Sequence, residues 1–264
     1  MPKTIAFLDE PTDFSLVQGG PLFQLLLRAG LIKPSMDLAV RRIVVISLVA
    51  WAPLLVLSVM SGHAVGGLEV PFLYDLGAHA RLLLCVPLFV AAEVIVHRRI
   101  KMTVRQFLDR GIVAPEDQPG FESLIASAMR LRNSVLVEVL LLAFAIAGGY
   151  WLGKRYVAMQ VATWFAAPID GRTQMTTAGY WYLFVSLTIF RFLWVRWYFR
   201  LFVWYRFLWQ VSRHVRLRLN ALHPDRAGGL AFLSGSVFAF APVLLAHTIG
   251  LAGIFGGRIW HEGA

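Results

Sequence analysis

Long runs of apolar residues alternate along the chain with shorter polar segments. Five runs are predicted to cross a membrane as helices, at residues 43–60, 82–96, 134–152, 180–199 and 230–255. About 20 apolar residues in a helix span roughly 30 Å of hydrocarbon, and the shorter second run is compatible with a start nearer Leu76. The pattern predicts an all-α fold, a polytopic transmembrane helical bundle. No internal repeat is visible, so residues 1–264 are treated as one transmembrane domain.

Three further segments are predicted to be short helices at the membrane surface. Residues 21–34, PLFQLLLRAGLIKP, are apolar but too short to span, and prolines bound them, which is typical of an interfacial helix. Residues 100–110 and 120–132 flank the sequence APEDQP, and the second has apolar residues at helical spacing. We expect these two segments to form a cytoplasmic helical hairpin within residues 97–133.

Composition agrees with a membrane protein: 58% of residues are hydrophobic, 15% are charged, and the mean hydropathy is +0.65. The net charge of +10 is distributed unevenly. If the amino terminus is cytoplasmic, the cytoplasmic segments carry 17 of the 25 Lys and Arg residues and the opposite loops carry five. This asymmetry follows the positive-inside rule and predicts that orientation.

The same distribution limits the expected partners. A basic inner face attracts anionic lipids, and no stacking platform or known fold accompanies it that would indicate nucleic-acid binding. The acidic residues Asp9, Glu10 and Asp13 interrupt the first twenty residues, which therefore do not resemble a cleaved signal. A single cysteine, Cys85, excludes an intrachain disulfide, and the histidines lack metal-ligand spacing, so no metal or cofactor is predicted.

Four charged residues fall inside the predicted spans. Glu93 and Glu138 are expected roughly 7–9 Å inside the cytoplasmic boundary, at about the depth of Arg191 and Arg196. Intramembrane arginines tend to face the bundle interior and pair, so we predict contacts among these four side chains. Such a layer is either an ion-pair staple that orders the bundle or an ion or proton relay. Arg200, at the predicted end of the fourth span, is expected to extend to the headgroups.

Aromatic residues are dense around the fourth predicted span. Trp194, Trp197, Trp204 and Trp209 lie near its cytoplasmic end. Tryptophans in this position are usually interfacial anchors, and we favour that role over an aromatic ligand box.

The segment HPDRAGGL, residues 223–230, allows two interpretations. In the structural one, Asp225 caps the following helix, and Gly228 and Gly229 permit close backbone approach. In the functional one, the segment forms a cytoplasmic site for an anion or a lipid headgroup. The site would consist of the positive end of that helix, His223, Arg226, Asp225, Gly228 and Gly229. The tripeptide HPD also occurs in chaperone J-domains, but here an apolar run follows it in place of a soluble helical hairpin.

HPDRAGGL, together with RFLWVRW at residues 191–197 and AEVIVHRR at residues 92–99, resembles a family of uncharacterised bacterial multi-pass inner-membrane proteins. The resemblance implies a bacterial inner membrane. No activity is assigned to that family, so it implies no catalytic residue.

The favoured functional hypothesis is transport or permeation of an ion or small solute, in which Glu93 and Glu138 titrate or coordinate and Arg191 and Arg196 set the local field. The alternative is a non-catalytic scaffold or accessory subunit that binds anionic lipid, a membrane partner or a second copy of itself. No nucleophile elbow or phosphate-binding loop indicates an enzyme.

Overall fold

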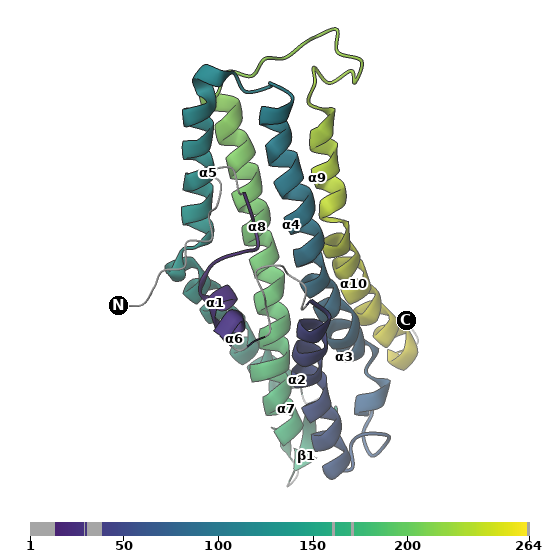
Figure 1. The fold of residues 1–264 in the computed structure, drawn as a ribbon. Coiled ribbons are helices and arrows are strands. Elements are labelled where there is room, and N and C mark those ends of the chain that lie inside the picture. The colour runs from purple at the N-terminus through teal and green to yellow at the C-terminus, as the bar shows by residue number, and fades with distance from the viewer. Residues whose placement is uncertain (1–13, 29, 31–38, 160–161, 170–171, 263–264) are drawn as a thin grey trace, which may run out of the picture. The chain divides into compact units, whose positions relative to one another are not determined.

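The computed structural model describes residues 14–28, 30, 39–159, 162–169 and 172–262, with only the backbone of residues 152–159, 169 and 262. Helices form almost all of its secondary structure, which confirms the all-α prediction (Figure 1). The strands in the described part of the chain are β1 (Ala166–Ile169) and β2 (Arg172–Met175), which pair as a short antiparallel hairpin. The sequence analysis did not predict this hairpin.

Four helical stretches are long and apolar enough to cross a membrane, so the chain is a transmembrane protein. They are α2 (Ala39–Met60), α3 to α4 (Leu76–Asp109), α7 to α8 (Thr177–His214) and the stretch Ala231–His261 that contains α9 and α10. A fifth crossing exists if α5 (Gln118–Arg132) and α6 (Val135–Met159), which meet at a 40° bend, are counted together. The predicted third span lies in α6.

Several of these stretches contain shorter pieces. α3 (Leu76–His79) and α4 (Val86–Asp109) are joined by a π-helical segment, Ala80–Cys85, and α7 (Thr177–Trp181) and α8 (Leu187–His214) by another, Tyr182–Ser186. The last stretch consists of a 3₁₀ turn (Ala231–Leu233), α9 (Ser234–Ala239) and α10 (Ala241–Glu262). Further 3₁₀ turns are Phe72–Tyr74 and Pro115–Asp117. Of the predicted interfacial helix 21–34, the structure shows α1 (Pro21–Arg28), and most of the remainder lies outside the described residues.

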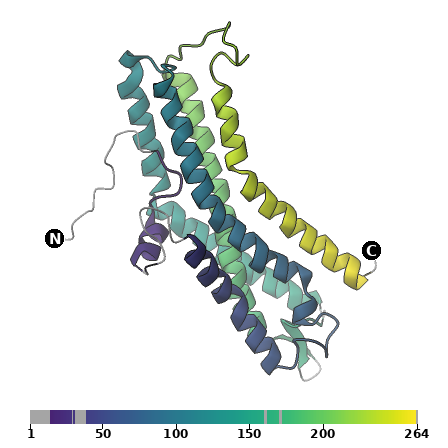
Figure 2. The same ribbon diagram turned by 45° about the vertical axis from the view of Figure 1, so that its right-hand side comes forward.

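The second and fourth spans are longer than predicted. α4 continues to Asp109, so the first arm of the predicted hairpin is part of the same helix rather than a separate surface segment. After Pro87 in its first turn, α4 contains no further proline or glycine, and Ile100, Val104 and Phe107 present a buried face at helical spacing. Likewise α8 continues to His214, well beyond the predicted end at Phe199. α4 and α8 lie side by side in both ribbon views (Figures 1 and 2).

The chain packs as two compact units, although the sequence analysis treated it as one domain. Unit 1 comprises Met1–Leu25, Ala92–Val135 and Tyr198–Ala241, and unit 2 comprises Leu26–Ala91, Leu136–Trp197 and Pro242–Ala264. α4 and α8 each contribute their carboxyl-terminal part to unit 1 and their amino-terminal part to unit 2.

In unit 2, a polar cap and an aromatic cluster bring the β-hairpin against the starts of α3 and α7. The Trp164 indole donates to Asp75 Oδ2 at 2.9 Å, while Asp75 Oδ1 caps α3 by accepting from the amide of Ala78. Thr176 caps α7 in the same way and donates to the Trp164 carbonyl at 2.9 Å. Position 179 requires glycine because a Cβ there would lie 2.1 Å from the carbonyl oxygen of Phe165, the residue before β1.

Unit 1 has an aromatic core between α4, α5 and α8. Phe121 of α5 contacts Phe107 of α4 at 5.6 Å and Phe207 of α8 at 5.8 Å between ring centroids. An extended amino-terminal strap, residues 14–20, adds Phe14, whose ring lies 4.8 Å from that of Phe207. Phe14, Phe107, Phe121 and Phe207 are at most 1% exposed. Unit 1 therefore contains a core of its own.

Two of the tryptophans lie in cores, and their prediction as interfacial anchors was wrong. Trp197 and Trp204 are at most 1% exposed, and the Trp197 indole donates to the Phe89 carbonyl at 3.1 Å. The prediction failed because it ended the fourth span at Phe199, whereas α8 continues and buries one face along its whole length. Trp209 is 58% exposed.

Candidate functional site

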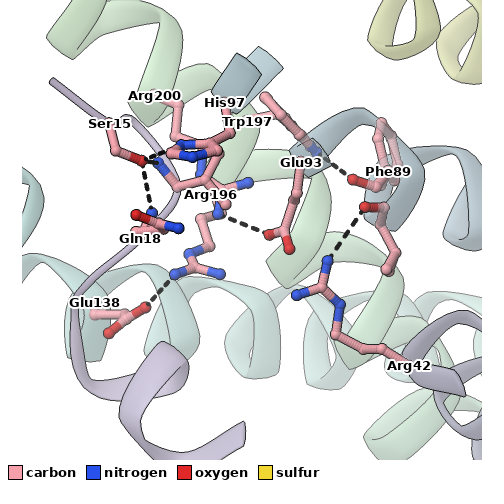
Figure 3. Close-up of polar contacts among 12 residues, drawn as sticks. Ser15, Gln18, Arg42, Phe89, Glu93, His97, Glu138, Arg196, Trp197 and Arg200 are labelled. Atoms are coloured by element: carbon pink, nitrogen blue, oxygen red, sulfur yellow. Dashed lines mark hydrogen bonds and ion pairs between the residues drawn. The ribbon is translucent and has the colours of Figure 1, made fainter. Parts of the chain in front are cut away.

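Unit 1 contains a buried ion pair between α4 and α8. Arg200 Nη2 lies 2.7 Å from Glu93 Oε1, and the two side chains are 3% and 6% exposed (Figure 3). The prediction that Arg200 extends to the headgroups was therefore wrong. Because α8 does not end at Phe199, Arg200 is an interior residue of a helix whose buried face meets α4. The two groups form a short charge-assisted hydrogen bond.

Unit 2 contains a second ion pair, between α6 and α8. Arg196 Nη2 lies 3.1 Å from Glu138 Oε1, and the side chains are 9% and 13% exposed (Figure 3). Arg191, one and a half turns earlier on α8, packs its side chain over Gly148 and Gly149 of α6. A Cβ on Gly149 would lie 3.1 Å from Arg191 Nη1, so the missing side chain accommodates the guanidinium.

Of the four residues predicted to contact one another, Glu138 and Arg196 form an ion pair. Glu93 pairs with Arg200, which was not among the four. A single charged layer that includes all four would combine residues of both units, and it stays a prediction.

Arg42 is a buried charge that the sequence analysis missed. It is the fourth residue of α2, is 2% exposed, and donates through Nη2 to the Val90 carbonyl at 3.4 Å (Figure 3). In the charge count it belongs to the basic residues of the amino-terminal segment. The sequence did contain a sign of this burial, since Arg42 lies just before the first apolar run. An arginine in that position can face either the headgroups or the bundle.

The ion pairs lie about one hydrocarbon thickness from the opposite ends of their helices. At 1.5 Å per residue, Glu93 is about 26 Å along its helix from Leu76. Arg196 is about 29 Å from the start of α7, and Glu138 about 32 Å from the end of α6. Since hydrocarbon is about 30 Å thick, these distances favour a position near the membrane boundary over a deep one.

The pairs can supply electrostatic coupling between helices. A buried carboxylate and guanidinium stabilise each other's charged forms, and separating them exposes two uncompensated charges. Each pair joins α8 to another helix, so relative movement of the helices must break or rearrange it. Each ion pair can therefore hold its two helices in one conformation until a proton, an ion or a charged solute replaces the carboxylate or the guanidinium.

The amino-terminal strap is held by a polar cluster that the sequence analysis also missed. Ser15 Oγ accepts from the amides of Val17 and Gln18 at 3.2 and 3.0 Å, which leaves its proton for His97 Nδ1 at 2.8 Å (Figure 3). Arg132, at the end of α5, donates to the Ser15 carbonyl. His97 follows Glu93 by one turn of α4, so the strap contacts the helix face that carries the unit 1 ion pair.

The HPDRAGGL segment forms a tight turn in unit 1, organised by Asp225. Its carboxylate accepts from the amides of Ala227, Gly229 and Ala231 at 2.9 to 3.0 Å. His223 Nδ1 lies 2.8 Å from Asp225 Oδ1 and 3.3 Å from the Asp225 amide, and the shorter contact indicates that Nδ1 donates to the carboxylate. Gly228 and Gly229 have φ of +66° and +96°, values that favour glycine.

The predicted anion site therefore already holds an anion, the carboxylate of the chain itself. Burial alone would raise the pKa of Asp225, but the hydrogen bonds from Ala227, Ala231, Gly229 and His223 outweigh it and hold the pKa well below its usual range. The donors that a phosphate would use are occupied. This geometry favours the structural role of Asp225, and the headgroup site stays a prediction.

Protonating or neutralising Asp225 is expected to loosen the turn. Because its pKa is lower in the folded chain, its contribution is complete above the unfolded value of about 3.9 and declines as the pH falls below it. At pH 7, Asp225→Asn should speed exchange of the amide protons of Gly229 and Ala231 at least tenfold. Hydrogen–deuterium exchange by mass spectrometry measures this, and unchanged exchange would contradict the capping role.

Comparison with known proteins adds no family to this description: no family model matches the chain, and no curated protein and no solved structure is similar to it.

Proposed function

We propose that the chain moves an ion or a small solute across a bacterial inner membrane, with its amino terminus in the cytoplasm. The observation that supports this is the pair of buried carboxylate–guanidinium contacts, Glu93 with Arg200 and Glu138 with Arg196, each joining α8 to another helix. Ionisable residues in membrane spans are costly and usually functional.

Energetics supports a role beyond stability. Replacing a buried ion pair by apolar residues of similar volume is often neutral or stabilising, so these charges are not needed merely to join helices. We propose that each pair, within its own unit, locks α8 against a neighbouring helix until the transported ion arrives. Protonation or binding of the transported ion separates a carboxylate from its arginine and lets α8 shift.

Flux through purified protein in liposomes tests this proposal. Pyranine inside the vesicles reports proton movement, and an electrode reports chloride and potassium. Glu93→Gln and Glu138→Gln are expected to lower the flux at least tenfold, while elution as a folded particle in size-exclusion chromatography persists. Glu116→Gln is the matched control, since Glu116 forms an ion pair with Arg218 in which the side chains are 75% and 60% exposed.

Two outcomes would reject the proposal. One is flux in both buried-glutamate variants at the level of the control. The other is wild-type protein that moves none of the three ions faster than empty liposomes do.

The second candidate is a scaffold or accessory subunit. Exposed arginines in unit 1, among them Arg98, Arg99, Arg130 and Arg213, favour it, because they offer charge to anionic lipid or to a partner. Copurification from native membranes separates the candidates, since a scaffold brings a partner at fixed stoichiometry. The family resemblance noted above implies the bacterial inner membrane under either candidate.

A further inference from the structure

Unit 1 contains an ordered loop, residues 215–230, between the end of α8 and the 3₁₀ turn that begins at Ala231. We call it the tip loop. Its backbone is fixed to the segment that follows α4. The amide of Arg218 donates to the Ile112 carbonyl at 2.8 Å, and the amide of Arg216 donates to Asp117 Oδ2 at 3.2 Å. Within the loop, Asn220 donates to the Gly228 carbonyl at 3.2 Å, and Asp225 holds the turn described above. The loop is therefore preorganised.

The tip loop presents apolar side chains to solvent despite this order. Leu222 is 93% exposed and Leu219 is 54% exposed. A single exposed leucine is ordinary on a surface. Leu222 differs because a hydrogen-bonded loop holds its backbone: its amide donates to Asn220 Oδ1 at 3.0 Å. Little conformational entropy would be lost when a partner covers it.

Arginines surround these leucines, and the acidic groups nearby are already engaged. Asp225 is occupied by backbone amides, Glu116 pairs with Arg218, and Asp117 accepts from the backbone. Arg213, Arg216 and Arg226 are exposed, and within the described part of the chain no ion pair is recorded for them. The surface that remains for a partner is positive with an apolar centre.

The backbone conformation of Arg226 is a separate indication that its side chain has a function. It is the one non-glycine residue with positive φ, +55°, among the residues that the structure describes. Glycine would adopt this conformation with less strain, and the turn uses glycine two and three residues later. Backbone strain of this kind concentrates at functional positions.

The tip loop is too far along α8 to meet headgroups of the same leaflet. α8 continues about 21 Å past Arg200, whose ion pair marks the boundary region. The headgroup layer of one leaflet is only roughly 5–8 Å thick. A soluble protein can reach the loop at this distance from Arg200. For these residues we therefore favour a protein partner over lipid headgroups.

We propose that the tip loop is a docking surface for an acidic, amphipathic segment of a soluble protein. An apolar side chain of the partner covers Leu222 and Leu219, and its carboxylates pair with Arg226, Arg216 and Arg213. The proposal is independent of transport, because none of these residues belongs to the buried ion pairs.

Peptide binding to the full chain tests this surface. The chain is placed in phosphatidylcholine nanodiscs, and two fluorescein-labelled amphipathic helical peptides, one of leucine and glutamate and one of leucine and lysine, are titrated by anisotropy. The acidic peptide is expected to bind at least tenfold more tightly. Leu222→Ser and Arg226→Gly should each weaken it at least fivefold, while Arg98→Gln, which removes an exposed arginine of α4, should not. Arg226→Gly suits the +55° conformation, so the loop stays folded.

Equal binding of both peptides, or tip variants that bind like Arg98→Gln, would overturn the proposal. A second measurement tests whether the tip loop contacts the membrane rather than a protein. Leu222→Cys in a Cys85→Ala background carries bimane in nanodiscs that contain phosphatidylglycerol and nitroxide-labelled headgroups. Emission is expected to stay unquenched, and strong quenching would assign the loop to the bilayer instead.

Discussion

Arg200→Met is expected to lower the free energy of unfolding by about 3–5 kcal/mol. The substitution removes one partner of a pair whose side chains are 3% and 6% exposed, and it leaves the Glu93 carboxylate buried without its compensating charge. That carboxylate must then take up a proton or draw in water. Methionine has a similar volume, so the loss reflects mainly charge rather than a cavity. Reversible unfolding in mixed detergent micelles, followed by circular dichroism, measures it.

The double variant Glu93→Gln/Arg200→Met should recover most of the lost stability, because no isolated charge remains. It also separates the two interpretations of the pair. If the pair only orders the bundle, the double variant is stable and keeps wild-type flux, whereas a gate predicts a stable protein with altered flux. Arg218→Met is the matched exposed control and should cost less than about 1 kcal/mol. If Arg200→Met costs no more than this control, the buried pair does not bear on folding.

The sequence predicted the architecture well because bilayer crossing depends on length and hydropathy, which are local properties of the chain. Where each helix ends is less local. Residues 97–109 are too polar for a span, yet they continue α4 because Phe107 packs against Phe121 and Phe232 in unit 1. Hydropathy alone cannot show that a helix continues past its apolar run and joins a second core.

Buried contacts between glutamates and arginines were predicted correctly, but only some of the partners were. Glu138 and Arg196 meet as expected, but Arg200 was assigned to headgroups because Phe199 was taken as the end of its span. On a continuous helix, Arg196 and Arg200 are one turn apart and share a face, and a longer α8 would have indicated this. Arg42 was missed for a similar reason, since a basic residue at a span boundary gives no sign of which way it points.

The strap illustrates what sequence patterns leave out. Residues 14–20 have no helical periodicity and follow several acidic residues, so nothing marked Phe14 as a core residue. Its burial depends on contacts with Trp204 and Phe207 of α8, which are far away in the sequence. Such contacts follow from tertiary packing rather than local propensity.

Phe14→Ala is expected to destabilise unit 1 by about 3–5 kcal/mol. The ring is fully buried and contacts Phe207 at 4.8 Å and Trp204 at 5.8 Å, so its removal leaves a cavity that an extended segment cannot easily close. Once Phe14 is lost, the contacts of Ser15 with His97 and Arg132 must hold the strap alone. Hydrogen–deuterium exchange should then rise in residues 14–20 and in the facing turns of α4 and α8.

Phe202→Ala is the control, because Phe202 lies on α8 in the same unit but is 56% exposed, and its removal should cost less than about 1 kcal/mol. Equal losses for the two variants would mean that the strap is only loosely associated with unit 1. A large loss for Phe14→Ala alone would show that an extended segment of the amino terminus completes the core of unit 1. Because the strap contacts α4 one turn from Glu93, its release should also change the flux measured in liposomes, which would link the amino terminus to the ion pair.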